Sequence, residues 1–240
     1  MRFYDENDCP WNFMEAVIAV ILLIPLILIL IIPIAYLIDR SMGEVFFSPS
    51  GISNFGFTLG YFVQTAAFLI LLWFFVFYRN RASWYDLGIR SFNLLKGVFL
   101  FIFGIIVTFI IHITYNVIFR SIIPWDTGQT KIMQLIENEN ISIIMLFIVA
   151  VIIAPFCEEL FFRGFLYPAF KKKMRVLPAM FLSSILFAVF HFEPAVLILL
   201  LGMGFVLAFI YEKTGSLIPS ILLHLLYNLA AIIILFQIKY

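Results

Sequence analysis

Seven long apolar runs constrain the fold of this chain more than any other feature of its sequence. A membrane-spanning helix needs about 20 mostly apolar residues, and charged residues fall near the ends of most runs. Hydrophobic residues make up 64% of the 240-residue chain and charged residues 12%, against about 25% charged residues in soluble domains. We therefore predict an all-α fold, a polytopic membrane helical bundle of about seven transmembrane helices. The runs are residues 16–38, 55–78, 97–119, 142–170, 176–192, 195–211 and 216–238.

All seven runs are expected to belong to a single transmembrane domain over residues 1–240. The net charge of +1 and the lack of a basic stripe exclude nucleic acid as a partner, so the bilayer is the main environment. The first run is too long for a signal peptide, and we expect it to remain as a span. Residues 129–138 have the apolar spacing of a short amphipathic surface helix.

The distribution of Lys and Arg predicts the orientation of the chain. Most of them fall on the side that receives the N-terminus, residues 79–96 and Lys171–Lys173. Cytoplasmic loops carry the excess of Lys and Arg. We therefore expect an integral protein of a bacterial cell membrane with a cytoplasmic N-terminus.

A charged run, Glu158-Glu159-Leu160-Phe161-Phe162-Arg163, interrupts the fourth apolar segment. A charge at the centre of a membrane helix costs about 2.5–3.5 kcal/mol, and such residues mark functional sites. Glu159 and Arg163 are four residues apart, so they share a helix face and are expected to pair. Glu158 lies about 100° round the helix and has no partner in its own helix, which makes it the stronger functional candidate.

Three histidines, His112, His191 and His224, also lie in apolar runs. Counted from the nearest cytoplasmic charge, Glu158, His191 and His224 lie at depths of roughly 20, 24 and 16 Å. Asn228, one turn after His224, lies at roughly 22 Å. Four polar residues on three helices thus share one layer near the middle of the bilayer, which predicts a mid-membrane polar site. His112 is expected to make an interhelical hydrogen bond instead.

These residue types suit the hydrolysis of a peptide bond. A carboxylate and an imidazole can hold a water molecule and take its proton. A second His with an Asn can donate hydrogen bonds to the oxyanion of a tetrahedral intermediate. The residues alone leave two alternatives to these hydrolytic roles open. The Glu159–Arg163 pair can serve packing only, and one Glu with two His can ligate zinc.

Three of these segments together resemble the signature motifs of the CPBP intramembrane protease family. The family is also called the CAAX protease or Abi family and includes the Rce1-type endopeptidases. The resemblance covers residues 140–238, which we predict to be the catalytic core, and Leu87-Gly88-Ile89-Arg90 resembles a stretch found upstream in the family. The matching motifs are Glu158-Glu159-x-x-x-Arg163, Phe187-x-x-x-His191 and His224-x-x-x-Asn228.

The resemblance implies a role for each motif residue. Glu158 and His191 would activate the water, and His224 with Asn228 would bind the oxyanion. Glu159 and Arg163 would support Glu158. The family resemblance favours a metal-free, glutamate-type mechanism without a cofactor. Zinc held by Glu158, His191 and His224 is the alternative.

The expected substrate is a membrane-associated peptide or protein, reached from a cavity open to the cytosol. Nothing in the sequence chooses between a prenylated protein and a peptide that is matured by cleavage. Two other functions remain as alternatives. One is a non-catalytic immunity or partner protein of the same fold. The other is a proton-coupled transporter that uses Glu158 and the histidines as a relay.

Overall fold

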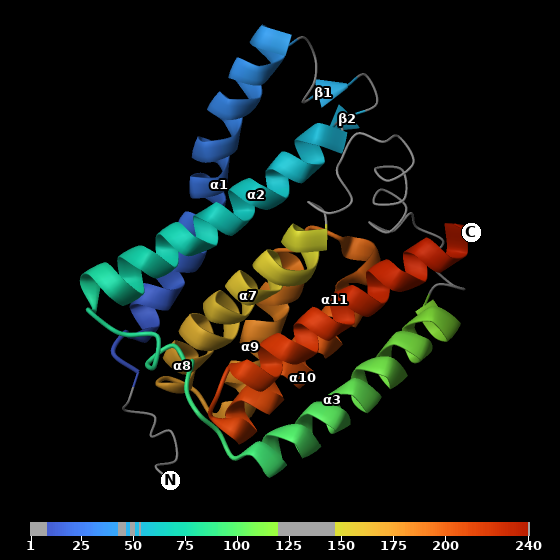
Figure 1. Cartoon of the computed structure of the whole chain (residues 1–240). Helices are drawn as coiled ribbons and strands as arrows, with labels where there is room; N and C mark the ends of the chain where they lie inside the picture. The colour runs from blue at the N-terminus through green and yellow to red at the C-terminus, as the bar shows by residue number, and fades with distance from the viewer. Residues whose placement is uncertain (1–8, 43–46, 49–50, 53, 120–146, 240) are drawn as a thin grey trace.

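The computed structural model describes residues 9–42, 47–48, 51–52, 54–119 and 147–239, and these are almost entirely helical (Figure 1). The surface helix expected at 129–138 lies outside the described residues. The elements are α1 (Phe13–Met42), β1 (Phe47–Ser48), β2 (Gly51–Ile52), α2 (Asn54–Leu72) with a π-helical extension (Trp73–Arg79), α3 (Leu94–Thr114) with a π-helical extension (Tyr115–Phe119), a π-helical turn (Ile148–Ile153), α7 (Ala154–Glu159), a π-helical segment (Leu160–Leu166), α8 (Tyr167–Lys171), α9 (Val176–Val189), a 3-10 turn (Pro194–Val196), α10 (Leu197–Thr214) and α11 (Ile218–Lys239).

The described helices fit a membrane bundle, as the apolar runs predict. Four helical segments are long and apolar enough to cross a bilayer. Two further apolar helices are shorter, and the nearly continuous helix from residue 148 to 171 makes a seventh segment. The prediction of a helical membrane bundle is therefore confirmed. The four long segments are Phe13–Arg40, Leu59–Arg79, Leu94–Ile118 and Pro194–Thr214, and the two shorter helices are Val176–Val189 and Ile218–Ile234.

The helix that carries the charged run is the centre of the bundle. Helix α7 contacts both α2 and α11, and Figure 1 shows it between them. Nearly every side chain from Ala154 to Lys171 is buried, and the rings of Phe161, Phe162 and Phe165 are fully enclosed. By contrast, α1 exposes much of its apolar surface. The charges that are costly in a bilayer therefore face protein rather than lipid.

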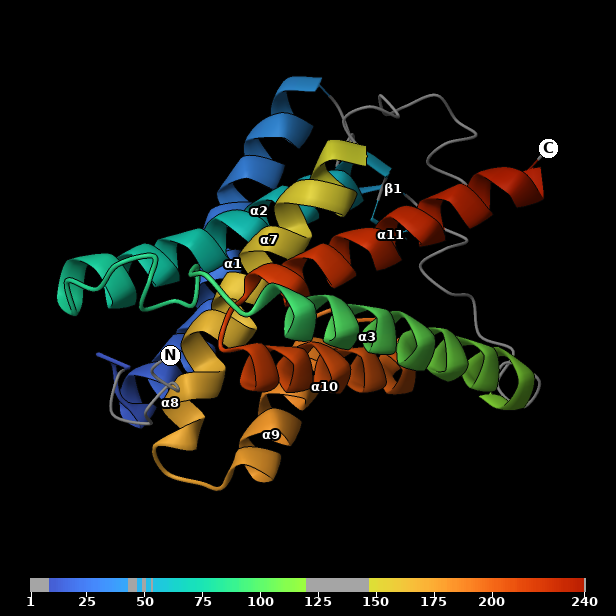
Figure 2. The same cartoon turned by 60° about the horizontal axis from the view of Figure 1, so that its bottom comes forward.

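The remaining helices enclose this centre from the other side. Helix α10 packs against α9, α3 and α11. Figure 2 shows α3 lying along α10 and α11 at the edge of the bundle, with α8 and α9 forming a hairpin. Helices α9 and α11, which carry the histidine motifs, thus both pack next to the central helix or its π-helical continuation.

The connection before α3 fixes the start of α11. The Leu217 amide donates to the Gly88 carbonyl at 2.9 Å, and Arg90 Nε donates to the Gly215 carbonyl at 2.5 Å. Gly88 has a φ of 98° and lies so close to Tyr211 that a Cβ would come within 2.8 Å of its ring. Only glycine meets both conditions without strain. The Leu87–Arg90 stretch therefore holds the turn from which α11 begins.

The fifth apolar run departs from its expected helical course. Helix α9 ends at Val189 rather than at residue 192. The His191 amide donates to Ala188, three residues back, at 3.3 Å, and Phe192 takes a left-handed φ of 53°. Pro194 disfavours helical geometry at Glu193, which has a φ of −120° and a ψ of 85°. His191 therefore lies on a turn beyond the helix end.

Candidate active site

Three elements bring the polar residues of the central site together. Glu158 and Glu159 close α7, His191 lies on the turn after α9, and His224 lies in the first half of α11. Glu158 Oε2 is 3.7 Å from His191 Nε2 and 3.7 Å from His224 Nε2. The expected approach of Glu158 to His191 is therefore present, and His224 joins the same carboxylate.

Glu159 has a different environment from its neighbour. Its side chain is 0% exposed, and its Oε1 accepts from Arg163 Nη1 at 2.7 Å. The predicted ion pair between these residues is thus confirmed. The same Oε1 lies 2.9 Å from His224 Nδ1. Sequence reasoning missed this contact and assigned Glu159 to support Glu158, because spacing within one helix says nothing about a ring on another.

Arg163 is held on three sides in the protein interior. Its Nη2 donates to the Gly204 carbonyl at 3.0 Å, and its guanidinium lies 4.2 Å from the centre of the Phe187 ring. Phe187 also contacts the His191 ring at 4.5 Å and the His224 ring at 5.6 Å. The aromatic residue of the second motif therefore packs against Arg163 and both imidazoles.

The hydrogen-bond partners of the two rings fix which nitrogen carries a proton. His191 Nδ1 lies 2.6 Å from the Phe187 carbonyl, which only accepts. His224 Nδ1 lies against the Glu159 carboxylate, which accepts when ionised. Nδ1 is therefore the donor in both rings. A ring that carries only this proton directs the lone pair of its Nε2 towards Glu158.

Access to the site is uneven. The side chain of His191 is 21% exposed and that of Glu158 is 11% exposed, whereas His224 is 3% exposed. A reacting group therefore reaches the site along the His191 side. His224 and Glu159 form its closed end.

Asn228 is tied to the segment that leads into α7. Its Nδ2 donates to the Ala150 carbonyl at 2.9 Å. One turn separates it from His224 on α11, so the two share a face of that helix. An amide nitrogen has two N–H groups, and the bond to Ala150 uses one of them. The role of Asn228 in binding an oxyanion stays a prediction.

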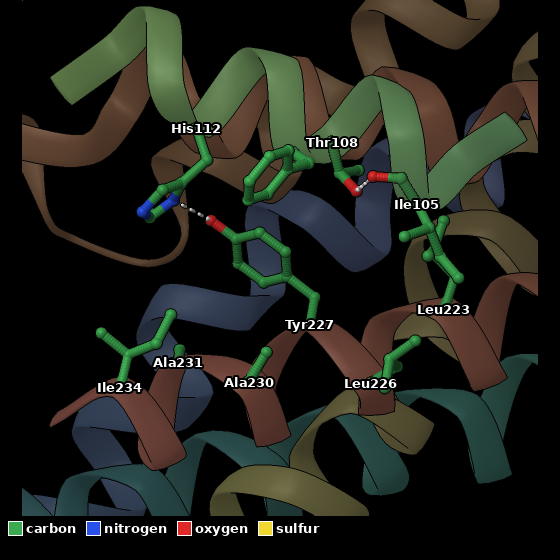
Figure 3. A pocket seen from close by; sticks show the side chains of 10 residues that line it. Ile105, Thr108, His112, Leu223, Leu226, Tyr227, Ala230, Ala231 and Ile234 are labelled. Atoms are coloured by element: carbon green, nitrogen blue, oxygen red, sulfur yellow. Dashed lines mark hydrogen bonds between the residues drawn. The ribbon is translucent and has the colours of Figure 1, made fainter. Parts of the chain in front are cut away.

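His112 lies in a different place, as expected. Its Nδ1 is 3.1 Å from the Tyr227 hydroxyl, across the interface between α3 and α11. Figure 3 shows this pair at one end of an apolar pocket of about 140 Å³, whose lining includes Leu223, Leu226 and Ala230. The predicted interhelical hydrogen bond of His112 is thus confirmed.

The donor set was also compared with what a metal ion requires. Among the residues that the structure describes, no three His, Cys, Asp or Glu side chains converge closely enough to hold a metal. Zinc ligands lie about 2.0–2.2 Å from the ion when they are nitrogen or oxygen. The 3.7 Å separations from Glu158 Oε2 to the two Nε2 atoms are distances between donors and not to an ion, so the metal-free mechanism stays a prediction.

Comparison with known proteins finds a family that resembles the segment carrying the central site. Residues 140–230, which carry all three motifs, match the profile of the Rce1-like family, described as type II CAAX prenyl endopeptidase Rce1-like. This segment is therefore similar to that family of peptidases. The Rce1-like segment includes α7, α9, α10 and most of α11, and it excludes α1, α2 and α3.

A curated protein is similar to part of this chain. The protein named "Putative membrane peptidase YdiL" from Bacillus subtilis (strain 168) is 31% identical to this chain over 105 residues. The alignment covers 40% of this chain and 43% of that protein, so the chain spans less than half the length of the relative. No solved structure matches the chain.

Proposed function

We propose that this protein is an intramembrane endopeptidase that hydrolyses a peptide bond of a membrane-associated substrate with water activated by Glu158 and His191. The observation that carries the proposal is the 3.7 Å separation between Glu158 Oε2 and His191 Nε2. This distance is too long for a direct hydrogen bond, and it leaves room for one water molecule to contact both groups.

The tautomers assign the two hydrogens of that water. His191 Nε2 is an acceptor, because Nδ1 donates to Phe187. One hydrogen of the water points to this nitrogen, and the other goes to Glu158 as the oxygen attacks the carbonyl carbon. Glu158 then passes the proton to the nitrogen of the leaving amine, and the carbon–nitrogen bond breaks. The carboxylate is regenerated and no covalent enzyme intermediate forms.

Stabilisation of the oxyanion falls to His224 and Asn228. An oxyanion needs donors about 2.7–3.1 Å away. His224 donates from Nε2 only if the ring carries two protons. Glu159 at Nδ1 and Glu158 opposite Nε2 both stabilise such a charged ring. If His224 carries that second proton, its positive charge and that of Arg163 balance the negative charges of the two glutamates. The net charge of the cluster is then zero, which reduces the free-energy cost of burying it in a bilayer.

The substrate is proposed to be a lipid-attached or amphipathic peptide. The family is described as a CAAX prenyl endopeptidase family, and the site lies within a bundle that lipid surrounds. Two internally quenched peptides in proteoliposomes separate the classes. One carries a farnesylated cysteine four residues from its C-terminus, and the other is an unmodified amphipathic peptide.

Glu158→Gln tests the activity directly, because it removes the base and keeps the shape of the side chain. We expect cleavage by the variant to fall by about 10²–10⁴-fold with unchanged expression. Glu193→Gln, which changes a carboxylate outside the cluster, is the matched control and should cleave normally. Peptidomics of membranes from wild-type and Glu158→Gln cells extends the test to native substrates, whose uncleaved precursors should accumulate in the variant.

Two outcomes favour other functions. A Glu158→Gln cell with a normal phenotype and no accumulated precursor indicates a non-catalytic partner or immunity protein. Proton-dependent flux in liposomes without cleavage of any peptide indicates a transporter. Either outcome overturns the peptidase proposal.

A further inference from the structure

Helix α2 contacts the site although it lies outside the Rce1-like segment. Gln64 and Phe68 are four residues apart and therefore share one face of the helix. The Phe68 ring packs against Phe161 at 4.7 Å and against Phe162 at 5.5 Å, two and three residues after Glu159. The same face thus borders the helix that carries the proposed base.

Gln64 connects this face to the end of α9. Its Nε2 donates to the Phe190 carbonyl at 2.9 Å. Phe190 follows the last residue of α9, where carbonyl groups have no partner within the helix, and its side chain is buried. A residue 126 positions earlier in the chain therefore satisfies the carbonyl group that directly precedes His191.

His191 depends on this turn for its position. The helix has ended, so the His191 backbone is held by a local bond to Ala188 at 3.3 Å and is followed by Phe192 in the left-handed region. The ring bond to Phe187 orients the imidazole, but it does not tie the turn to the helix of Glu158. The Gln64 bond joins this turn to another element, α2.

We propose that Gln64 is a positioning residue that holds the turn of His191 against α2 and so keeps His191 Nε2 opposite Glu158. Helix α2 contacts both parts of the site. Its Phe68 packs on the helix that carries Glu158, and its Gln64 binds the turn that carries His191. The inference rests on the proposed function. It adds a part of the catalytic unit that lies outside the residues matched to the family.

Gln64→Met tests the proposal, because methionine has nearly the same length and lacks the amide donor. A displacement of a reacting group by about 1 Å can cost about 10²-fold in rate. We expect kcat for the quenched peptide to fall by about 10–10²-fold with little change in KM. Thr65→Val is the matched control, because the Thr65 hydroxyl donates to the Tyr61 carbonyl of its own helix. It should keep the wild-type kcat.

A second measurement does not depend on cleavage. In protein labelled with ¹⁵N-histidine, the ring signals of His191 should report a single Nδ1–H tautomer in the wild type. The assignment comes from a His191→Gln variant. In Gln64→Met we expect these signals to broaden or shift, while those of His224 stay in place.

The two readouts separate failure of this inference from failure of the proposed function. A wild-type kcat and unchanged His191 signals in Gln64→Met overturn the positioning role. An equal loss of kcat in Thr65→Val also overturns the positioning role of Gln64, because any change in α2 would then lower the activity. If the wild type cleaves neither peptide, the proposed function fails, and the His191 signals still decide whether Gln64 positions the ring.

Discussion

Two adjacent glutamates with the same chemistry have different surroundings in this protein. Glu159 is fully enclosed and bonds Arg163 and His224. Glu158 faces two imidazole nitrogens at 3.7 Å and keeps a small exposed surface. A rotation of about 100° along the helix thus separates a carboxylate that pairs with a buried guanidinium from the one that we propose to react.

Glu159→Gln should cost stability as well as activity. The variant leaves the Arg163 charge uncompensated in the interior, and breaking a buried pair in this way costs about 3–5 kcal/mol. Chemical unfolding in detergent micelles measures the loss in free energy of unfolding. Glu158→Gln is the comparison, because its carboxylate pairs with no guanidinium, and it should lose activity with a much smaller change in stability. Equal stabilities would contradict the structural role of Glu159.

Asn228→Ala tests the oxyanion role at the same scale. Removing one donor of an oxyanion site costs about 10²–10³-fold in kcat, and KM should change little. Tyr227→Phe is the neighbouring control on α11, because it removes only the hydrogen bond to His112. Such interhelical bonds average about 0.6 kcal/mol. A normal kcat in Asn228→Ala would remove this residue from the proposed mechanism.

At the scale of elements, close approach of α10 to the central helix decides where Arg163 lies. Arg163 Nη2 reaches the Gly204 carbonyl because that position has no side chain. A Cβ there would lie 3.1 Å from Arg163 Nη2, 3.2 Å from Phe187 and 3.2 Å from the backbone of Ser184. Gly202, half a turn earlier, faces only the flexible side chain of Ile111 at 3.2 Å.

A pair of glycine substitutions in α10 follows from this contrast. Gly204→Ala should lower both activity and thermal midpoint, because Arg163, Phe187 and the backbone of Ser184 all lie within 3.2 Å of the added methyl group. Gly202→Ala should be neutral or stabilising, since Ala is favoured over Gly in helices by about 0.8–1.0 kcal/mol and Ile111 can rotate. Thermal unfolding and peptide cleavage are measured for both. Similar effects of the two changes would contradict the packing argument.

The sequence was informative about elements where a local rule applies. Apolar length predicted the spans, and the four-residue spacing predicted the Glu159–Arg163 pair. The end of α9 was placed three residues too late, because apolar residues continue to Phe192 while Pro194 already restricts the chain. Two contacts could not be predicted in this way. Glu159 and His224 are 65 positions apart in the chain, and Gln64 and Phe190 are 126 positions apart. No pattern within a single helix contains such pairs.

At the scale of the whole molecule, the bundle encloses its charges and exposes its apolar surface. The central helix is buried, whereas α1 and α3 present many large apolar side chains outwards. This arrangement is the reverse of a soluble enzyme and suits lipid as the solvent. It also leaves a polar cluster with few routes to water.

Metal independence is a prediction that is tested on the purified whole protein. Because the proposed water activation uses Glu158 and His191 without a metal ion, we expect cleavage to persist in 1,10-phenanthroline or EDTA. Elemental analysis of the purified protein should find less than one zinc per chain at full activity. Loss of cleavage on chelation, restored by added Zn²⁺, would overturn the metal-free mechanism.

The proposed zero net charge of the buried cluster, together with the path of the proton, predicts how the membrane potential affects the reaction rate. Moving one elementary charge across a membrane potential is worth about 2.3 kcal/mol per 100 mV. In the proposed reaction the proton passes from water to Glu158 and then to the leaving amine, all within the site. Almost no charge therefore crosses the field, so hydrolysis would run at the same rate in an energised cell membrane and in a depolarised one.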